Sequence, residues 1–219
     1  MNLFNFLTGS RPPLVEQSMT DLGVMLDTAD SMFAAATNSL LDNEPLHVDL
    51  STQDDIINER EQTIRRSVLE HILADPRAEL SLSLLLVSIV QDAERLGDLA
   101  KSIAKAADLA SSPRMGRHVE ALREIRDRVQ SAFPRVRRSF IVGDAKVGRV
   151  VMDEHAQTKV DVGDFLQRLA EADDLTSNEA VVLSISARMI GRWSLLRVSH
   201  RHTVRSYAPE AHIFGEIGE

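Results

Sequence analysis

Two segments in the first half of the chain place acidic side chains at helical spacing. Glu94 and Asp98 are four residues apart, so a helix would carry both carboxylates on one face, at a repulsive cost of roughly a few tenths of a kcal/mol. Asp54, Asn58 and Glu61 share one face in the same way in an earlier segment. If two such helices pack antiparallel, the stripes would meet and offer an oxygen-only site. Such a site suits Mg, Ca, Mn or Fe better than a metal that prefers soft ligands.

A structural explanation of the same acidic residues stays open. Acidic side chains on helices commonly form a solvated face and pair with nearby cations. Arg60, Arg65 and Arg95 are close enough in the sequence to serve as those partners. On this interpretation the two acidic stripes bind no metal.

A stripe of arginines follows near the end of the chain. Guanidinium groups match the geometry of phosphate and carboxylate, so this stripe predicts a surface for an anion or an acidic partner. The structural alternative is that its members pair with acids such as Asp153 and Glu154. The stripe comprises Arg188, Arg192, Arg197, Arg201 and Arg205.

The rest of the sequence excludes several classes of function. The chain has 219 residues and no cysteine, which excludes a disulfide framework, an iron–sulfur cluster and a cysteine nucleophile. It contains no P-loop, no dinucleotide-binding glycine motif and no GxSxG motif, and its seven histidines show no metal-ligand spacing. A net charge of −8 argues against a general nucleic-acid binder, and no apolar run approaches the ~18 residues of a membrane helix. We therefore expect a protein that is not an enzyme, does not bind nucleic acid and has no transmembrane segment.

Helix signals divide the chain into six segments that must position these residues. Aromatic residues make up only 4% of the chain, which disfavours a β-sandwich or barrel. Ser51, the Asp75-Pro76 pair and the capping box from Thr176 to Glu179 mark helix starts. The predicted helices begin and end near residues 12–41, 51–74, 76–110, 115–142, 145–172 and 176–207.

Three helices followed by three of similar length indicate an internal duplication. Leu96-Gly97 aligns with Ile190-Gly191 at an offset of 94 residues. Glycine inside a helix costs ~1 kcal/mol relative to alanine, so its repetition suggests a close helix approach in both halves. The expected fold is all-α, with two antiparallel three-helix bundles at residues 1–111 and 112–219 joined side by side.

The two halves differ in charge. Residues 1–110 contain 8 basic and 18 acidic residues, a net charge of −10. Residues 111–219 contain 17 basic and 15 acidic residues, a net charge of +2. At the offset of the duplication, Arg188 and Arg192 stand where the first half has Glu94 and Asp98.

Two stretches resemble the motifs of the PhoU family of phosphate-uptake regulators. Residues 92–104, D-A-E-R-L-G-D-L-A-K-S-I-A, resemble the family's signature helix, which reads roughly D-L-E-R-I-G-D-x-A-x-N-I-A. Residues 54–61, D-D-I-I-N-E-R-E, resemble its other motif, D-x-x-I-N-x-x-E, with Asp54 or Asp55 as the acid. The six-helix, two-bundle layout resembles the family over nearly the whole chain.

The resemblance implies a cytoplasmic, non-enzymatic protein that binds a metal cluster. It also implies two partners, a phosphate ABC transporter and a sensor histidine kinase, to which the protein reports phosphate sufficiency. Glu94 and Asp98 would be metal ligands, and the neighbouring helix would contribute candidates in Asp54, Asp55 and Glu61. The metal would be a divalent or trivalent ion held by carboxylates, such as Fe, Mg, Mn or Zn.

The second half departs from the family pattern. Arg188 and Arg192 replace the two expected carboxylates, and cations cannot ligate a metal. We therefore expect metal in the first repeat only, with Arg188 and Arg192 paired to Asp153 and Glu154.

Alternatives to this interpretation stay open. One is a metal-free helical scaffold whose arginine stripe docks an acidic partner, and another is an accessory protein of a different phosphate-transporter type. An apolar N-terminal group, residues 3–7, is expected to pack on the bundle or on a second subunit of a homodimer. Docking on a partner or peripherally on the inner membrane is the alternative for this group.

Overall fold

The computed structural model describes residues 13–74, 80–141 and 144–196. They form six α-helices, the first of which continues into a short π-helix, and no strand occurs within these ranges. The elements are α2 (Pro13–Thr37), η1 (Asn38–Asp42), α3 (Leu50–Ala74), α4 (Leu80–Asp108), α5 (Arg117–Ile141), α6 (Ala145–Ala170) and α7 (Ser177–Leu196).

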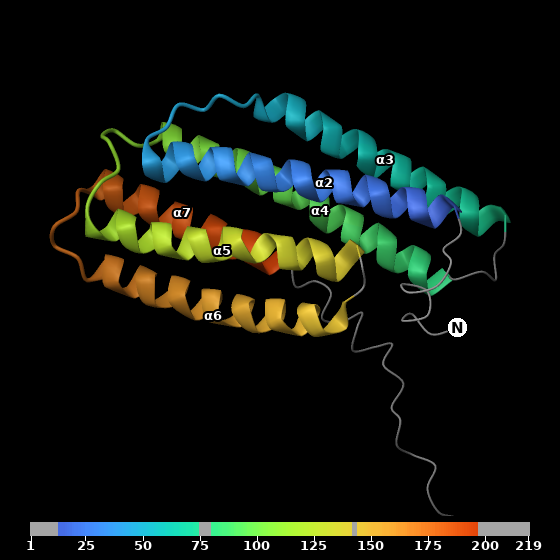
Figure 1. The fold of residues 1–219 in the computed structure, drawn as a ribbon. Helices are drawn as coiled ribbons and strands as arrows, with labels where there is room; N and C mark the ends of the chain where they lie inside the picture. Colours follow the sequence, from blue (N-terminus) through green and yellow to red (C-terminus); the bar gives the residue numbers. More distant parts are fainter. Residues whose placement is uncertain (1–12, 75–79, 142–143, 197–219) are drawn as a thin grey trace, which may run out of the picture.

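The helices pack as two three-helix units that lie side by side (Figure 1). In the first unit α2, α3 and α4 contact one another, and in the second α5, α6 and α7 do the same. The units are joined where α2 lies against α5 and α4 lies against α7, whereas α3 and α6 lie at opposite edges of the molecule. The expected all-α fold of two three-helix bundles is confirmed.

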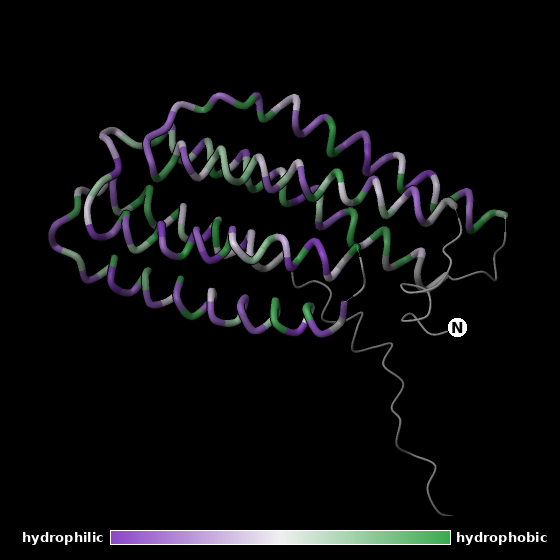
Figure 2. The backbone as a smooth tube through the Cα atoms, in the orientation of Figure 1, coloured by the Kyte–Doolittle hydropathy of each residue, from purple (hydrophilic) through white to green (hydrophobic). Residues whose placement is uncertain are grey.

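The core runs through both units because apolar residues recur at helical spacing. On α2, Leu22, Met25, Ala29, Met32 and Phe33 are fully buried, as their spacing predicts. The outer helices α3 and α6 mix hydrophilic with hydrophobic positions, as expected of helices that bury one face (Figure 2).

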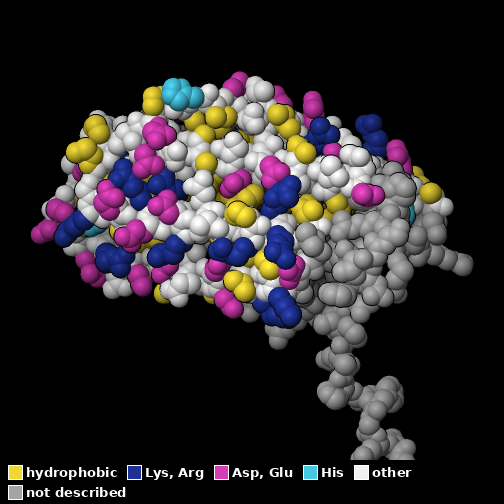
Figure 3. Space-filling model, viewed as in Figure 1, with side chains coloured by type: hydrophobic (Ala, Val, Ile, Leu, Met, Phe, Trp, Pro, Cys, Tyr) yellow, Lys and Arg dark blue, Asp and Glu magenta, His cyan; other side chains and the backbone are white. Residues whose placement is uncertain are grey.

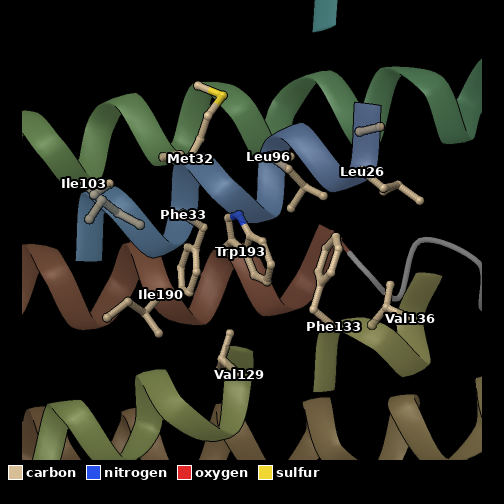
Figure 4. Close-up of a cluster of buried hydrophobic side chains, with 14 of the residues drawn as sticks. Leu26, Met32, Phe33, Leu96, Ile103, Val129, Phe133, Val136, Ile190 and Trp193 are labelled. Atoms are coloured by element: carbon tan, nitrogen blue, oxygen red, sulfur yellow. The ribbon is translucent and has the colours of Figure 1, made fainter. Parts of the chain in front are cut away.

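An aromatic group at the centre of the molecule connects the two units (Figure 4). Trp193 of α7 is fully buried, and its ring stacks on Phe33 of α2 with centroids 4.1 Å apart. Phe133 of α5 approaches the same ring at 5.3 Å. Three helices from both units therefore share one packing centre.

The C-terminal end of the first helix is fixed by arginines of the second unit. Asp42 accepts a hydrogen bond from Arg123 Nε at 2.7 Å and another from Arg126 Nη1 at 2.6 Å. Arg123 also donates to the backbone carbonyl of Leu41. Carbonyls in the last turn of a helix lack partners within it, so these arginines satisfy the helix end and join the units.

Charged side chains of both signs are mixed over the face formed by α2 and α5 (Figure 3). Arg137 of α5 binds Asp27 of α2 at 2.6 Å, and Arg135 of α5 binds Glu154 of α6 at 2.6 Å. This face is therefore an ion-paired surface.

None of the described helices has an apolar stretch suited to crossing a lipid bilayer.

Two predicted helix starts had different outcomes. The capping box is confirmed, because the Glu179 carboxylate accepts from the Thr176 N–H and the Glu179 N–H donates to the Thr176 hydroxyl. The cap expected at Ser51 is wrong. Asp49 is the residue that accepts hydrogen bonds from the N–H groups of Ser51 and Thr52, and a carboxylate is as good an N-cap as a hydroxyl.

Some predictions fall outside the described residues. They are the helix start at Asp75-Pro76, the apolar residues 3–7, the continuation of the last helix to residue 207, and Arg197, Arg201 and Arg205 of the arginine stripe.

Candidate metal centre

The contact between α3 and α4 brings the two acidic stripes together. Asp54 and Glu61 lie on α3, and Glu94 and Asp98 lie on α4. The charges of Asp98, Glu61 and Asp54 all act on the Glu94 carboxylate. The four side chains therefore share one electrostatic environment, as antiparallel packing of the two stripes would produce.

Gly97 allows the close approach on which this arrangement depends. A Cβ atom at this position would lie 2.9 Å from Ile57 Cδ1 and 3.4 Å from Asp54 Oδ1. The first distance is shorter than real Cβ contacts, so a side chain here would force the end of the Ile57 side chain to move. The absence of a side chain lets the Asp54 carboxylate lie against the backbone of α4.

Lys101 is placed between two of the four carboxylates. Its Nζ lies 2.6 Å from Asp54 Oδ2 and 2.9 Å from Asp98 Oδ1, so it bridges α3 and α4. Burial acts to lower the pKa of Lys101, but the hydrogen bonds to Asp54 and Asp98 outweigh it and the pKa is raised. Asn58 Nδ2 also donates to Asp54 Oδ2 at 3.2 Å. Asp54 thus accepts hydrogen bonds from both Lys101 and Asn58.

Glu94 is the carboxylate whose charged form is most disfavoured by its surroundings in this group. Burial, followed by the charge of Asp98 and a hydrogen bond with Asp98, raises the pKa of Glu94 to about 6. Glu61 and Asp54 raise it further. A carboxyl group whose charge is disfavoured by three other carboxylates is a natural place for a cation.

The remaining acids and arginines show how far the solvated-face explanation holds. Arg65 binds Glu61 at 2.7 Å and Arg95 binds Asp92 at 3.3 Å, as that explanation expects. The third predicted partner, Arg60, instead binds Asp21 of α2 at 2.8 Å. The predicted ligand Asp55 is exposed and makes no ion pair within the described part of the chain.

The oxygen atoms at this contact are of the kind that binds metals, but they do not surround one common point. The site offers four carboxylates and an amide without sulfur or imidazole, which is the set that hard cations prefer. Among the described residues, no three acidic or histidine side chains surround a common point. Lys101 pairs with Asp54 and Asp98, and Arg65 pairs with Glu61. These three carboxylates therefore point toward cations of the protein.

Lys101 is the site residue that sequence reasoning missed. A local signal existed, because Lys101 follows Asp98 by three residues and such pairs face each other on a helix. Its bond to Asp54 joins residues that are 47 apart in the chain. Only the packing of α3 on α4 reveals that second partner.

The second unit repeats the helix contact but reverses the charge. A Cβ atom on Gly191 of α7 would lie 3.3 Å from Val162 Cγ2 of α6, so Val162 corresponds to Ile57. Counting from these contacts, the positions of Asp54, Glu61, Glu94 and Asp98 are taken by Lys159, Leu166, Arg188 and Arg192.

The pairing predicted for Arg188 and Arg192 is wrong. Both side chains are exposed and form no ion pair within the described ranges. Glu154 is instead held by Arg135 of α5 at 2.6 Å. Because α6 packs against both α5 and α7, the acid was equally available to either helix, and periodicity could not decide between them.

Comparisons with known proteins relate both the fold and the acidic segment to one family. Residues 22–107 match the family model of the PhoU domain, and this range contains both acidic stripes. The crystal structure of PhoU from Pseudomonas aeruginosa is similar with a TM-score of 0.78 at 23% identity, over 88% of this chain and 98% of that one. The phosphate transport system regulatory protein PhoU from Streptococcus pneumoniae is similar with a TM-score of 0.73 at 18% identity, over 91% and 96%. No curated protein sequence matches the chain.

Proposed function

We propose that this chain, which contains a PhoU domain at residues 22–107, regulates phosphate transport as a non-enzymatic adaptor that binds metal in its first three-helix unit only. The observation that carries the metal proposal is the gathering of four carboxylates at the α3–α4 contact, where burial and then the charges of the other three raise the pKa of Glu94 to about 6. The similarity to the two PhoU structures supports the regulatory role.

The residues that would hold the metal are Glu94 and Asp98 of α4 with Asp54 and Glu61 of α3. A bound divalent or trivalent cation would supply positive charge where these carboxylates repel one another. Asp54 is better placed than Asp55, because Asp54 lies against Gly97 whereas Asp55 is exposed. The corresponding positions of the second unit carry Lys159, Leu166, Arg188 and Arg192, which supply no ligand.

Elemental analysis of the purified protein tests this site. We expect metal in the wild-type protein, and we expect Glu94→Gln and Asp98→Asn to lose it. Asp55→Asn is the matched control, since it removes an acid from the same helix as Asp54 without touching the group. Full metal content in Asp98→Asn, or metal in two separate clusters, would contradict the proposal.

The adaptor role places the protein on the cytoplasmic side of the inner membrane, between a phosphate ABC transporter and a sensor histidine kinase. The name of the Streptococcus protein, a phosphate transport system regulatory protein, supports the first partner. Co-purification with the tagged transporter and with the tagged kinase tests both. Sedimentation of the purified chain tests whether it acts as a homodimer. A protein that captures neither partner would contradict the adaptor role.

A second candidate function is a metal-free scaffold, or an accessory protein of another phosphate-transporter type. It is favoured by the exposed Arg188 and Arg192 of α7, which are free of ion pairs within the described residues. A third cation, Lys159 of α6, stands at the position that Asp54 has in the first unit. These cations would dock an acidic surface. Arg188→Glu combined with Arg192→Glu should then abolish partner capture, while the metal-site variants should leave it intact.

A further inference from the structure

We infer that Lys101 is a built-in counter-ion of the acidic group, which pairs with Asp54 and Asp98 when no metal is bound and must move aside before a metal can bind. This inference rests on the proposed metal site and adds a competitor to it that belongs to the protein itself. It makes the affinity of the site a balance between an external cation and a tethered one.

The geometry shows that Lys101 and a metal compete for the same oxygens. Its Nζ lies 2.6 Å from Asp54 Oδ2 and 2.9 Å from Asp98 Oδ1, which are two of the four proposed ligands. A metal needs the lone pairs that these hydrogen bonds occupy. The ammonium also bridges α3 and α4, which is the role that a metal shared between the two stripes would have.

The same contacts explain why the carboxylates are not gathered around one point. Asp54 and Asp98 are directed to the ammonium, whereas Glu94 hydrogen-bonds Asp98 and forms no ion pair with a cation of the described residues. One ammonium carries a single positive charge and so cannot neutralise Asp54, Asp98 and Glu94 together, while Glu61 pairs with Arg65. A divalent or trivalent cation brings more charge to the same place, which gives it an advantage over Lys101.

Lys101 is also able to leave. Its side chain is 30% exposed, whereas that of Asp54 is 15% exposed, so the lysine reaches the group from the solvent side. A lysine has a flexible four-carbon stem and can turn its ammonium into water while the stem stays on the helix surface. Metal binding would therefore release a cation to the surface of the α3–α4 contact without unfolding either helix.

Affinity measurements on metal-depleted protein test the competition. Lys101→Met keeps the stem and removes the charge, and Lys105→Met is the matched control, because Lys105 lies one turn further along α4, is exposed and forms no ion pair within the described residues. In a titration with Mn²⁺ we expect Lys101→Met to bind at least about tenfold more tightly than wild type. Lys105→Met should bind like wild type.

Lysine labelling of the wild-type protein provides a readout that needs no variant. An amine reagent followed by mass spectrometry should modify Lys101 slowly in the metal-free protein and several-fold faster when Mn²⁺ is added. Lys105 should react at the same rate in both states.

The outcomes separate this inference from the metal site on which it rests. Mn²⁺ binding by wild type and Lys101→Met with equal affinity, or unchanged labelling of Lys101, overturns the counter-ion role and leaves the metal site standing. Tighter binding by Lys101→Met than by wild type supports the inference. No binding by either protein overturns both proposals.

Discussion

The environment of Glu94 favours the binding of a cation beside its carboxylate. Protein cations compensate Asp54, Asp98 and Glu61, but the principal influences on Glu94 are burial and neighbouring negative charge. A fold under selection for stability alone gains nothing from such a carboxylate. Its position is understandable if a cation is supplied from outside, because that cation removes the repulsion.

Replacing Glu94 with Gln should therefore stabilise the metal-free protein. The raised pKa means that, between the ordinary value of 4.5 and about 6, the folded protein holds a proton that the unfolded chain releases. Wild-type stability thus falls as pH rises through this window and stays lower above it. In thermal melts with a chelator, the variant should have the higher Tm at pH 7.5, and its advantage should shrink toward pH 4.5. A variant that melts at or below the wild-type Tm at pH 7.5 would contradict this interpretation.

The sequence was informative about single residues where the signal is local. The four-residue spacings predicted the stripes that carry Glu94 and Asp98, and these stripes do approach each other. It was uninformative where the partner is distant, as for the bond from Lys101 to Asp54. It also failed where one acid has two candidate partners, because Glu154 pairs with Arg135 of α5.

At the scale of the helix, two glycines lie where an outer helix packs on its inner neighbour, α3 on α4 and α6 on α7. Gly97 faces Ile57 of α3, and Gly191 faces Val162 of α6, so the duplicated glycine marks the same contact in both units. The aligned glycines predicted this close approach from the sequence. The side chain that each would meet could be known only from the packed helices.

Gly97→Ala should destabilise the protein although alanine is the better helix former. The new Cβ would lie 2.9 Å from Ile57 Cδ1, and because Ile57 is fully buried its terminal methyl must move within a packed core, which costs about 1–3 kcal/mol. Gly163→Ala in α6 is the matched control, because a Cβ there meets nothing within 4 Å. The control should gain about 0.5–1 kcal/mol from helix propensity. Urea unfolding of both variants measures the difference, and equal effects would show that the close contact at Gly97 is unimportant.

Helix bounds were predicted well where capping chemistry is unambiguous. The reciprocal bonds of Thr176 and Glu179 confirm the box at the start of α7. The start of α3 was misplaced because two good capping residues, Asp49 and Ser51, lie close together. Which of the two residues caps the helix depends on backbone geometry, and the residue types alone do not determine that geometry.

At the scale of the whole molecule, the charge asymmetry has a structural meaning. The negative first half contains the carboxylate group at the α3–α4 contact, and the second half has cations at the positions related by the duplication. The aromatic centre of Phe33, Trp193 and Phe133 makes the two units one packed body. The six helix segments and their duplication predicted two bundles, but the residues that join them are far apart in the sequence and carry no local pattern.

Asp42→Ala should weaken the junction between the units more than loss of an exposed ion pair does. It removes the carboxylate of the first unit that pairs with Arg126, whose side chain is 9% exposed, and leaves Arg126 with Asn38 in that unit and with Asp127 of its own helix. Removing one member of a fully buried pair costs about 3–5 kcal/mol, and the bonds that Arg126 keeps to Asn38 and Asp127 should hold the loss to the lower end of that range. Asp27→Ala is the control, because its pair with Arg137 also joins the units but is exposed and is worth about 0.2–1 kcal/mol. Chemical denaturation measures the free energy of unfolding of both variants. Equal losses would show that the Asp42 pairs contribute no more to the contact between the units than an exposed ion pair does.

The central claim, one metal site confined to the first unit, is tested most directly by anomalous diffraction from crystals of the full chain soaked in Mn²⁺. We predict an anomalous peak between α3 and α4, within ligand distance of Glu94 and Asp98, with no peak at the corresponding place between α6 and α7. A peak beside Arg188 and Arg192, or no peak beside Glu94 at saturating Mn²⁺, would contradict the claim.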